Sequence, residues 1–229
     1  MKPCDIEDQG VDCHVDPTSK TITKLVFKRR TPMVEIWLED QPALTCHLDL
    51  ILGYQLETGM TLEPKVIEAL RVDQRALEAW QKVLRYCHSR TRTVAEVRRF
   101  LSAAEVPEEL AEDFMERLRR DYSLDDHRAA SEFDEQNRER LGDRRIRSEL
   151  RRRGISGGVI ESVMGSRSGL DRETEEFETA LALAKKKVDS DRGVDPRKVA
   201  MRVAGLLQRK GYSQSVIRKV AQSLDLKLF

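Results

Sequence analysis

The sequence predicts a mainly α-helical protein in which tandem three-helix repeats form an elongated, curved array, preceded by a small N-terminal β-rich module. Three observations support this class. About 35% of the 229 residues are charged and 5% are aromatic, which suits a helical chain with thin cores. Apolar residues alternate near the N-terminus and take up a helical period after Glu63. A helix–glycine–helix pattern then recurs about every 50 residues.

The β-rich module is expected over residues 21–70. Apolar and polar side chains alternate strictly from Val34 to Leu38, as in a half-buried strand. The run Asp40-Gln41-Pro42 predicts a turn, after which residues 43–48 would return antiparallel. Trp37 would either pack within the module or act as a contact aromatic, and packing is the favoured interpretation.

Helix signals follow in order. Thr93 stands three residues before Glu96 and predicts a capping box that opens a helix over residues 94–103. Pro107 fits the first turn of the next helix, and Asp125 with Asp126 predicts a helix cap after a turn. Later helices are expected over residues 143–153, over residues 170–188 and from Pro196 onward.

The repeat is clearest around Gly154 and Gly211, which stand 57 residues apart. Each ends a basic amphipathic helix and is followed by a second short helix. A degenerate copy places Val106 in register with Ile155. Glycine at these corners suits a left-handed residue just beyond a helix end. We expect three repeats, over residues 71–122, 123–167 and 168–229.

Several classes of protein are disfavoured. Residues 1–20 are polar and predict a disordered tail, and no stretch predicts a signal peptide or a membrane span, so a cytoplasmic protein is expected. Scattered histidines, cysteines without CxxC spacing and the lack of a phosphate-binding glycine motif predict no catalysis, no cofactor and no metal. The cysteines, expected to be free thiols, are Cys4, Cys13, Cys46 and Cys87.

The helix over residues 143–153 carries a strip of guanidinium groups. Glu149 is its only internal acid, so the usual mixing of signs at i, i+4 is not expected there. Arginine forms bidentate contacts with phosphate and carboxylate, so the strip suits nucleic acid or an acidic protein surface; the alternative is a merely solvated face. The strip comprises Arg144, Arg147 and Arg151 on one outer face, with Arg145 and Arg152 beside them.

Basic residues recur in the other two repeats. Charge of one sign at one location in three repeats predicts that the array follows one extended, negatively charged partner. The additional candidates for contact with a partner or DNA in the first repeat are Arg90, Arg92 and Arg98. Those in the last repeat are Lys186, Arg197, Lys198, Arg202, Arg209 and Lys210.

Three stretches match one family in order and spacing. RTRTVAEVRRFL, from Arg90, is similar to R-x-R-[ST]-x-x-E-[LV]-R-x-x-L. YSLDDHRAA, from Tyr122, is similar to Y-[LI]-[DN]-D-x-x-[FY]-A, with an extra Ser123 and with Ala129 where an aromatic is usual. GDRRIRSELRRRGI, from Gly142, matches G-x-x-[RK]-I-x-x-E-L-x-x-[RK]-G-I. Over about residues 21–229 the chain thus resembles the RecX family, the small modulators of the RecA recombinase.

The resemblance implies a modular, non-catalytic, monomeric protein that binds the filament of RecA on single-stranded DNA, along its helical groove. It further implies inhibition of ATP hydrolysis, strand exchange and the stimulation of LexA cleavage, in recombination, DNA repair and the SOS response. Two alternatives stay open. Three-helix units with a basic second helix are also typical of independent helix-turn-helix DNA-binding proteins, and the chain could be a helical scaffold for another partner.

Overall fold

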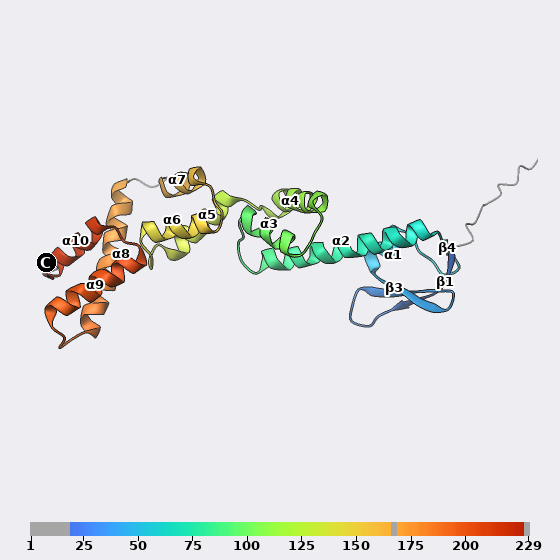
Figure 1. The fold of residues 1–229 in the computed structure, drawn as a ribbon, viewed down its shortest axis with the longest axis horizontal. Coiled ribbons are helices and arrows are strands. Elements are labelled where there is room, and N and C mark those ends of the chain that lie inside the picture. Colours follow the sequence, from blue (N-terminus) through green and yellow to red (C-terminus); the bar gives the residue numbers. More distant parts are fainter. Residues whose placement is uncertain (1–18, 166–168, 227–229) are drawn as a thin grey trace, which may run out of the picture. The chain divides into compact units, whose positions relative to one another are not determined.

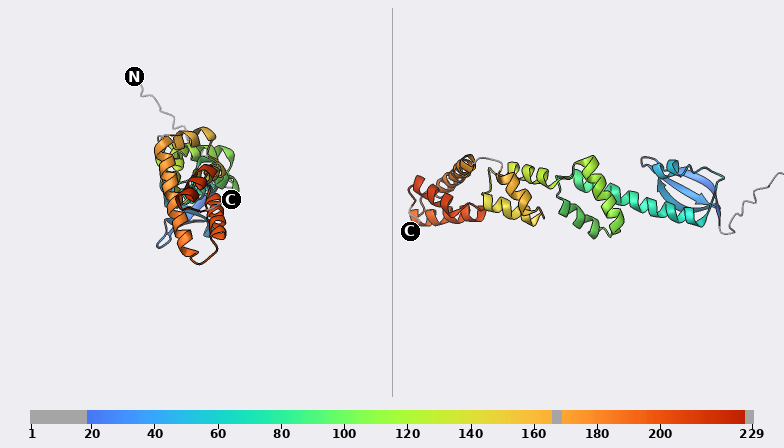
Figure 2. Two further views of the ribbon diagram at one scale, coloured as in Figure 1. Left: turned by 90° about the vertical axis from the view of Figure 1, so that its left-hand side faces the viewer. Right: turned by 90° about the horizontal axis from the view of Figure 1, so that it is seen from above.

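The computed structural model describes residues 19–165 and 169–226, which form two compact units that divide at Lys82. Figure 1 shows the elements of each unit along the chain, and Figure 2 shows the same ribbon from two other sides. The expected tail, with Cys4 and Cys13, lies outside the described residues except for Ser19 and Lys20, and Lys20 already belongs to the first strand.

The first unit contains a four-stranded antiparallel sheet of order β3-β2-β1-β4. The strict alternation from Val34 to Leu38 is confirmed as a strand with one buried face. Phe27 lies opposite Val34 where the first hairpin begins. The strands are β1 (Lys20–Phe27), β2 (Met33–Leu38), β3 (Gln41–His47) and β4 (Thr61–Leu62).

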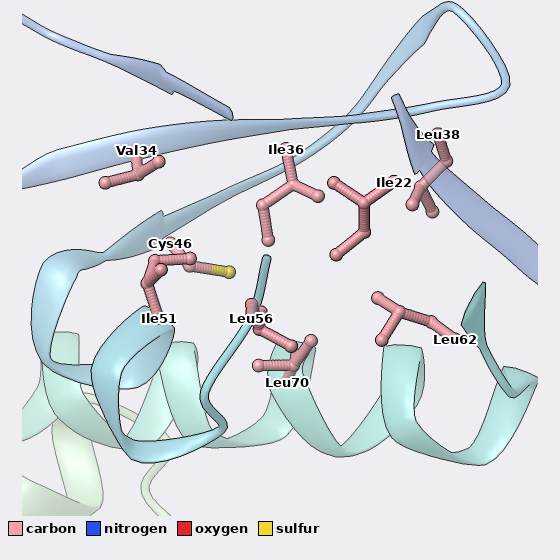
Figure 3. Close-up of a cluster of buried hydrophobic side chains, with 9 residues drawn as sticks. All are labelled: Ile22, Val34, Ile36, Leu38, Cys46, Ile51, Leu56, Leu62 and Leu70. Carbon is pink, nitrogen blue, oxygen red and sulfur yellow. The ribbon is translucent and has the colours of Figure 1, made fainter. Parts of the chain in front are cut away.

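Two helices cover one face of this sheet: α1 (Leu48–Gly53) and α2 (Pro64–His88). Figure 3 shows the sheet side chains pointing toward the helical residues Ile51 and Leu70, and all nine residues of this core are at most 5% exposed. The core comprises Ile22, Val34, Ile36, Leu38, Cys46, Ile51, Leu56, Leu62 and Leu70. The predicted boundary of the module at residue 70 and the division at Lys82 both fall within α2.

Two details of the module differ from expectation. The turn between β2 and β3 is formed by Glu39 and Asp40, both with positive φ, and Pro42 lies within β3 opposite Trp37. A two-residue turn of this kind matches the twist of a hairpin better than the longer turn expected from the proline. Trp37 does not join the core, because its buried neighbours in β2 face the helices and successive strand residues alternate.

The helices beyond α2 form three repeats. The end of α2, α3 (Val94–Ala103) and α4 (Glu108–Tyr122) make repeat 1. Repeat 2 comprises α5 (Asp126–Asn137), α6 (Asp143–Arg152) and α7 (Gly157–Gly165). Repeat 3 comprises α8 (Gly169–Ser190), α9 (Pro196–Lys210) and α10 (Gln214–Ser223), which pack on one another in Figures 1 and 2.

The expected helix ends are largely confirmed. Thr93 and Glu96 form the capping box of α3, and the Asp125 side chain caps α5. Gly154 and Gly211 have φ of +90° and +88°, so both corners are left-handed. Pro107 differs slightly, because it is the N-cap of α4 and the helix begins at the next residue.

Each of the later repeats has a small core of its own. Ile146 and Leu150 of α6 meet Ala130, Ile160 and other apolar residues in repeat 2. In repeat 3 the core brings together residues of α8, α9 and α10, including Tyr212 at the corner. Among the described residues, no helix could cross a membrane, no cluster of three or more histidines, cysteines or carboxylates could hold a metal ion, and Cys46 and Cys87 are free thiols.

Candidate interaction surface

The outward face of α6 follows from its buried face. Ile146 and Leu150 are fully buried four residues apart, which turns the arginines between and around them toward solvent. Arg144 and Arg151 are exposed, and neither forms an ion pair within the described part of the chain. These two guanidinium groups are therefore available to a partner.

The other three arginines of α6 already have acidic partners. Arg145 and Arg152 lie on either side of Glu149, with N–O distances of 2.7 and 2.6 Å. The expectation that α6 does not mix signs at helical spacing was wrong, because this one acid pairs with arginines both four residues before it and three after it. Arg147 pairs with Glu161 of α7, and this hydrogen bond lowers the pKa of the Glu161 carboxyl.

The candidates of repeat 1 are engaged as well. Arg90 pairs with Glu96 at 2.8 Å, and Arg98 pairs with Glu112 of α4. Arg92 stacks on the ring of Tyr86 at 3.7 Å and donates a hydrogen bond to the Tyr86 carbonyl oxygen. These contacts give the three arginines structural roles in the first repeat.

Repeat 3 presents a different surface, because most of its candidate cations have no ion pair within the described part of the chain. An open hollow of about 460 Å³ lies over α8 and α9, lined by four cations, Met201 and Gly205. Two of the four, Lys187 and Arg202, share Asp191 at 2.9 and 3.4 Å. Hydrogen bonds from both cations lower the pKa of Asp191, that from Lys187 most. The exposed candidates without an ion pair among the described residues are Lys186, Arg197, Lys198 and Arg209.

The fourteen candidates therefore fall into distinct groups. Six are exposed and unpaired in the described chain: Arg144 and Arg151 on α6, and the four of repeat 3. Lys210 is half-buried, and its carbonyl oxygen accepts a hydrogen bond from the backbone of Gly142. The remaining seven hold side-chain contacts within the protein: Arg90, Arg92, Arg98, Arg145, Arg147, Arg152 and Arg202.

Neighbouring repeats are joined in a way that was not anticipated from the sequence. The N-terminus of α3 abuts the C-terminus of α6, where the Arg153 carbonyl accepts a hydrogen bond from Thr93 Oγ1 at 2.7 Å. In the same way, the N-terminus of α6 abuts the C-terminus of α9, where the Lys210 carbonyl accepts one from the Gly142 backbone at 2.9 Å. Arg153 and Lys210 occupy equivalent positions in their repeats. The two contacts between repeats, which we call the first joint (α3 with α6) and the second joint (α6 with α9), therefore have the same geometry.

Acidic side chains complete each joint. The first backbone N–H of α3, that of Val94, donates to Asp126 of α5 at 2.9 Å. The equivalent N–H of α6, that of Asp143, donates to Glu176 of α8 at 3.1 Å. A carboxylate at a helix N-terminus satisfies an otherwise unpaired donor and complements the helix dipole. Each following repeat therefore caps the central helix of the repeat before it.

Buried charge concentrates at the second joint. Arg172 bridges Asp143 and Asp134, at 2.7 and 3.0 Å, and these contacts hold its pKa above the usual range although burial opposes this. Burial raises the pKa of Glu176. Burial also raises the pKa of Tyr212 to about 12, helped by Glu176 and Asp143.

Known proteins are similar to this chain in sequence. Two family models match: "RecX, third three-helix domain" over residues 173–221 and "RecX, first three-helix domain" over residues 79–118. A regulatory protein RecX of Streptomyces coelicolor is 34% identical over 145 residues, which cover 62% of the chain and 75% of that protein. The chain belongs to the RecX family.

Other RecX proteins match over most of the chain. That of Clostridium botulinum is 28% identical over 204 residues, covering 88% of the chain and 94% of that protein. The match to a crystal structure of regulatory protein RecX spans 89% of this chain and 99% of the chain in that structure, with a TM-score of 0.62 and 24% identity. RecX from Lactobacillus salivarius covers 67% of the chain and 98% of its own, with a TM-score of 0.56 and 21% identity. These likenesses confirm the helical-repeat fold.

Proposed function

We propose that this protein is a non-catalytic, monomeric, cytoplasmic regulator that binds the filament of RecA on single-stranded DNA. Binding would lower the ATPase, strand-exchange and LexA-cleavage activities of the filament. Membership of a family of regulatory proteins supports this proposal. The observation that carries it at the level of residues is the set of six exposed, unpaired cations on α6, α8 and α9.

The chemistry of these cations fits an extended anionic partner. Arginine binds carboxylate and phosphate in two-pronged contacts, and lysine binds phosphate as a point charge. Cations already paired internally would have to give up an ion pair before meeting a partner, whereas the six free ones would not. The contact is therefore expected to centre on Arg144, Arg151 and the hollow of repeat 3 that includes Lys198 and Arg209.

The alternative of an independent sequence-reading DNA-binding protein finds less support in α6. Base readers place Asn, Gln or Ser beside arginine at positions that reach base edges. In α6 only Ser148 is of this type, and Arg145 and Arg152 are committed to Glu149. This composition suits contact with a backbone or a protein surface.

The test is equilibrium binding to bare single-stranded DNA and to the same strand coated with the recombinase, over a series of salt concentrations. We expect the coated strand to be bound more tightly at every salt concentration. Tighter binding to bare duplex, with strong sequence preference and a steep salt dependence, would contradict the proposal and support the alternative.

A further inference from the structure

The first hairpin of the β-rich module has an unusual charge pattern. From Lys20 to Val34 the chain carries five cations and no acid, although residues 1–70 as a whole are acidic. All five cations are exposed, and none forms an ion pair within the described residues. The five are Lys20, Lys24, Lys28, Arg29 and Arg30.

Aromatic rings stand among these cations. Phe27 ends β1 and is 63% exposed, directly before the basic turn. Trp37 is half-buried on the sheet face that points away from the core, with Lys24 lying 5.8 Å from its ring centroid. The indole Nε1 of Trp37 donates to Glu35, which fixes the ring on the open face. Cations interleaved with exposed rings are the combination that binds the backbone and bases of a single strand.

The hairpin is held in place although its tip is solvated. The backbone N–H of Lys28 donates to the Met33 carbonyl at 3.0 Å and closes the turn. The carbonyl of Pro32 accepts from the N–H of Leu48 at 2.7 Å, which ties the turn to the start of α1. The basic tip is therefore displayed by a fixed backbone, and less ordering is needed on binding.

We propose that the β1–β2 hairpin and the adjoining open sheet face bind single-stranded nucleic acid. Lys24, Lys28 and Arg29 contact phosphates. Trp37 stacks on a base on the open face, and Phe27, which lies on the opposite face because it pairs with the core residue Val34, stacks on a base where the strand crosses the tip. Lysines along the part of β1 that extends beyond its short pairing with β4 also discourage aggregation, but that role does not require an exposed phenylalanine beside a triple-basic turn. The proposal goes beyond the proposed function, because all fourteen candidate residues lie in the second unit.

The test uses the full chain and a fluorescent oligothymidine without recombinase, followed by anisotropy over a salt series. One variant carries Lys24→Glu, Lys28→Glu and Arg29→Glu. Its matched control carries Lys65→Glu, Arg71→Glu and Arg75→Glu, three exposed α2 positions in the same unit with the same change of charge. The quantity compared is the slope of the logarithm of the binding constant against the logarithm of the salt concentration. We expect the hairpin variant to make this slope shallower by about 2, at about 0.7 for each phosphate that is no longer neutralised, and the control variant to leave the slope unchanged.

A second variant tests stacking without altering charge. Phe27→Ala is expected to weaken binding about tenfold, the effect of removing one stacked base. Leu52→Ala removes a comparably exposed apolar side chain, 66% exposed on α1, and is expected to leave binding unchanged. Because Phe27 is already solvated, its replacement leaves the fold intact.

Two outcomes would overturn the inference. The hairpin and control variants could bind the oligonucleotide equally, which would remove the hairpin from any contact with nucleic acid. Alternatively, the hairpin variant could keep its affinity for the bare strand and lose it only for the recombinase-coated strand, in which case the hairpin meets an acidic protein surface. Neither outcome alters the proposed role of Arg144 and Arg151, which is tested by inhibition of the recombinase.

Discussion

Glycine at the corners of repeats 2 and 3 meets two separate requirements. Its φ near +90° is costly for any other residue, and a Cβ at either corner would collide with the preceding repeat. At Gly154 the obstacle is Ala95, and at Gly211 it is the backbone and Cβ of Arg145. Repeat 1 has Glu105 at the equivalent corner, also left-handed with φ of 55°. A side chain is tolerated there because no preceding repeat docks on that corner.

Gly193 offers a control that separates the two requirements. Its φ is +91°, but a Cβ there would meet nothing within 4 Å. Gly193→Ala should lower the free energy of unfolding by about 1 kcal/mol, the cost of the left-handed backbone alone. Gly211→Ala should cost about 1–3 kcal/mol more, because the new methyl group overpacks the joint. If urea unfolding gave equal losses of unfolding free energy for Gly193→Ala and Gly211→Ala, the joint would not restrict the space at Gly211.

Glu176 should make the second joint sensitive to pH. Its folded-state pKa is raised by burial, so stability is lost as pH rises from its unfolded pKa of about 4.3 through the folded value. Glu176→Gln keeps an oxygen for the Asp143 N–H and removes this loss. We expect its stability relative to the natural protein to increase as the pH rises above the unfolded pKa of about 4.3.

Glu161→Gln is the matched control for that comparison. Arg147 lowers the pKa of Glu161, so the natural protein gains stability as the pH rises and this carboxyl ionises. Glu161→Gln lacks this gain. Its stability relative to the natural protein should therefore fall as the pH rises, opposite to the change expected for Glu176→Gln. A difference for Glu176→Gln that stays constant with pH would show that its carboxyl is not desolvated in the joint.

At the scale of elements, the central helices of repeats 1 and 2 begin inside joints. The N-terminus of α3 combines its own capping box with a carboxylate from α5 and a hydrogen bond to the end of α6. The hydroxyl of Thr93, which is fully buried, accepts from the N–H of Glu96 and donates to the Arg153 carbonyl. One side chain therefore stabilises both a helix and its junction with the next repeat.

Replacing this hydroxyl should cost more than replacing an ordinary cap. Thr93→Val keeps the side-chain shape, and we expect a loss of about 2 kcal/mol, about half from the cap and half from the missing hydrogen bond to Arg153. Ser213 caps only its own helix, α10, so Ser213→Ala should cost about 1 kcal/mol. Equal costs in thermal or urea unfolding would remove Thr93 from the joint.

Elements were predictable where local chemistry decides them. Strand alternation, the capping box and the corner glycines could all be recognised, because each depends on neighbours within a few residues. The pairings of Arg153 with Glu96 and of Arg172 with Asp143 could not, because they join residues 57 and 29 positions apart. The repeat alignment held a partial signal, since it places Arg153 and Lys210 at equivalent positions, but spacing alone does not show which helix end abuts which.

For the whole molecule, the distribution of free charge matters more than the net charge of +1. Counting arginines along α6 overestimated the surface open to a partner, because Glu149 and Glu161 engage three of them. The two pairs of Glu149 stand at helical spacings that the sequence already contained, whereas the pair of Arg147 with Glu161 joins two helices and could not be foreseen. Among the fourteen candidates, the six that stay free in the described chain are those of the proposed contact with the filament.

The most direct measurement is the ATPase of the recombinase on single-stranded DNA, titrated with this protein. We predict that Arg144→Glu with Arg151→Glu raises the concentration needed for half-inhibition at least about tenfold, because two charge contacts are reversed. Arg119→Glu with Arg140→Glu changes charge equally at two other exposed positions and should inhibit like the natural protein. Unchanged inhibition by the Arg144 and Arg151 variant, with its helicity intact, would contradict the account.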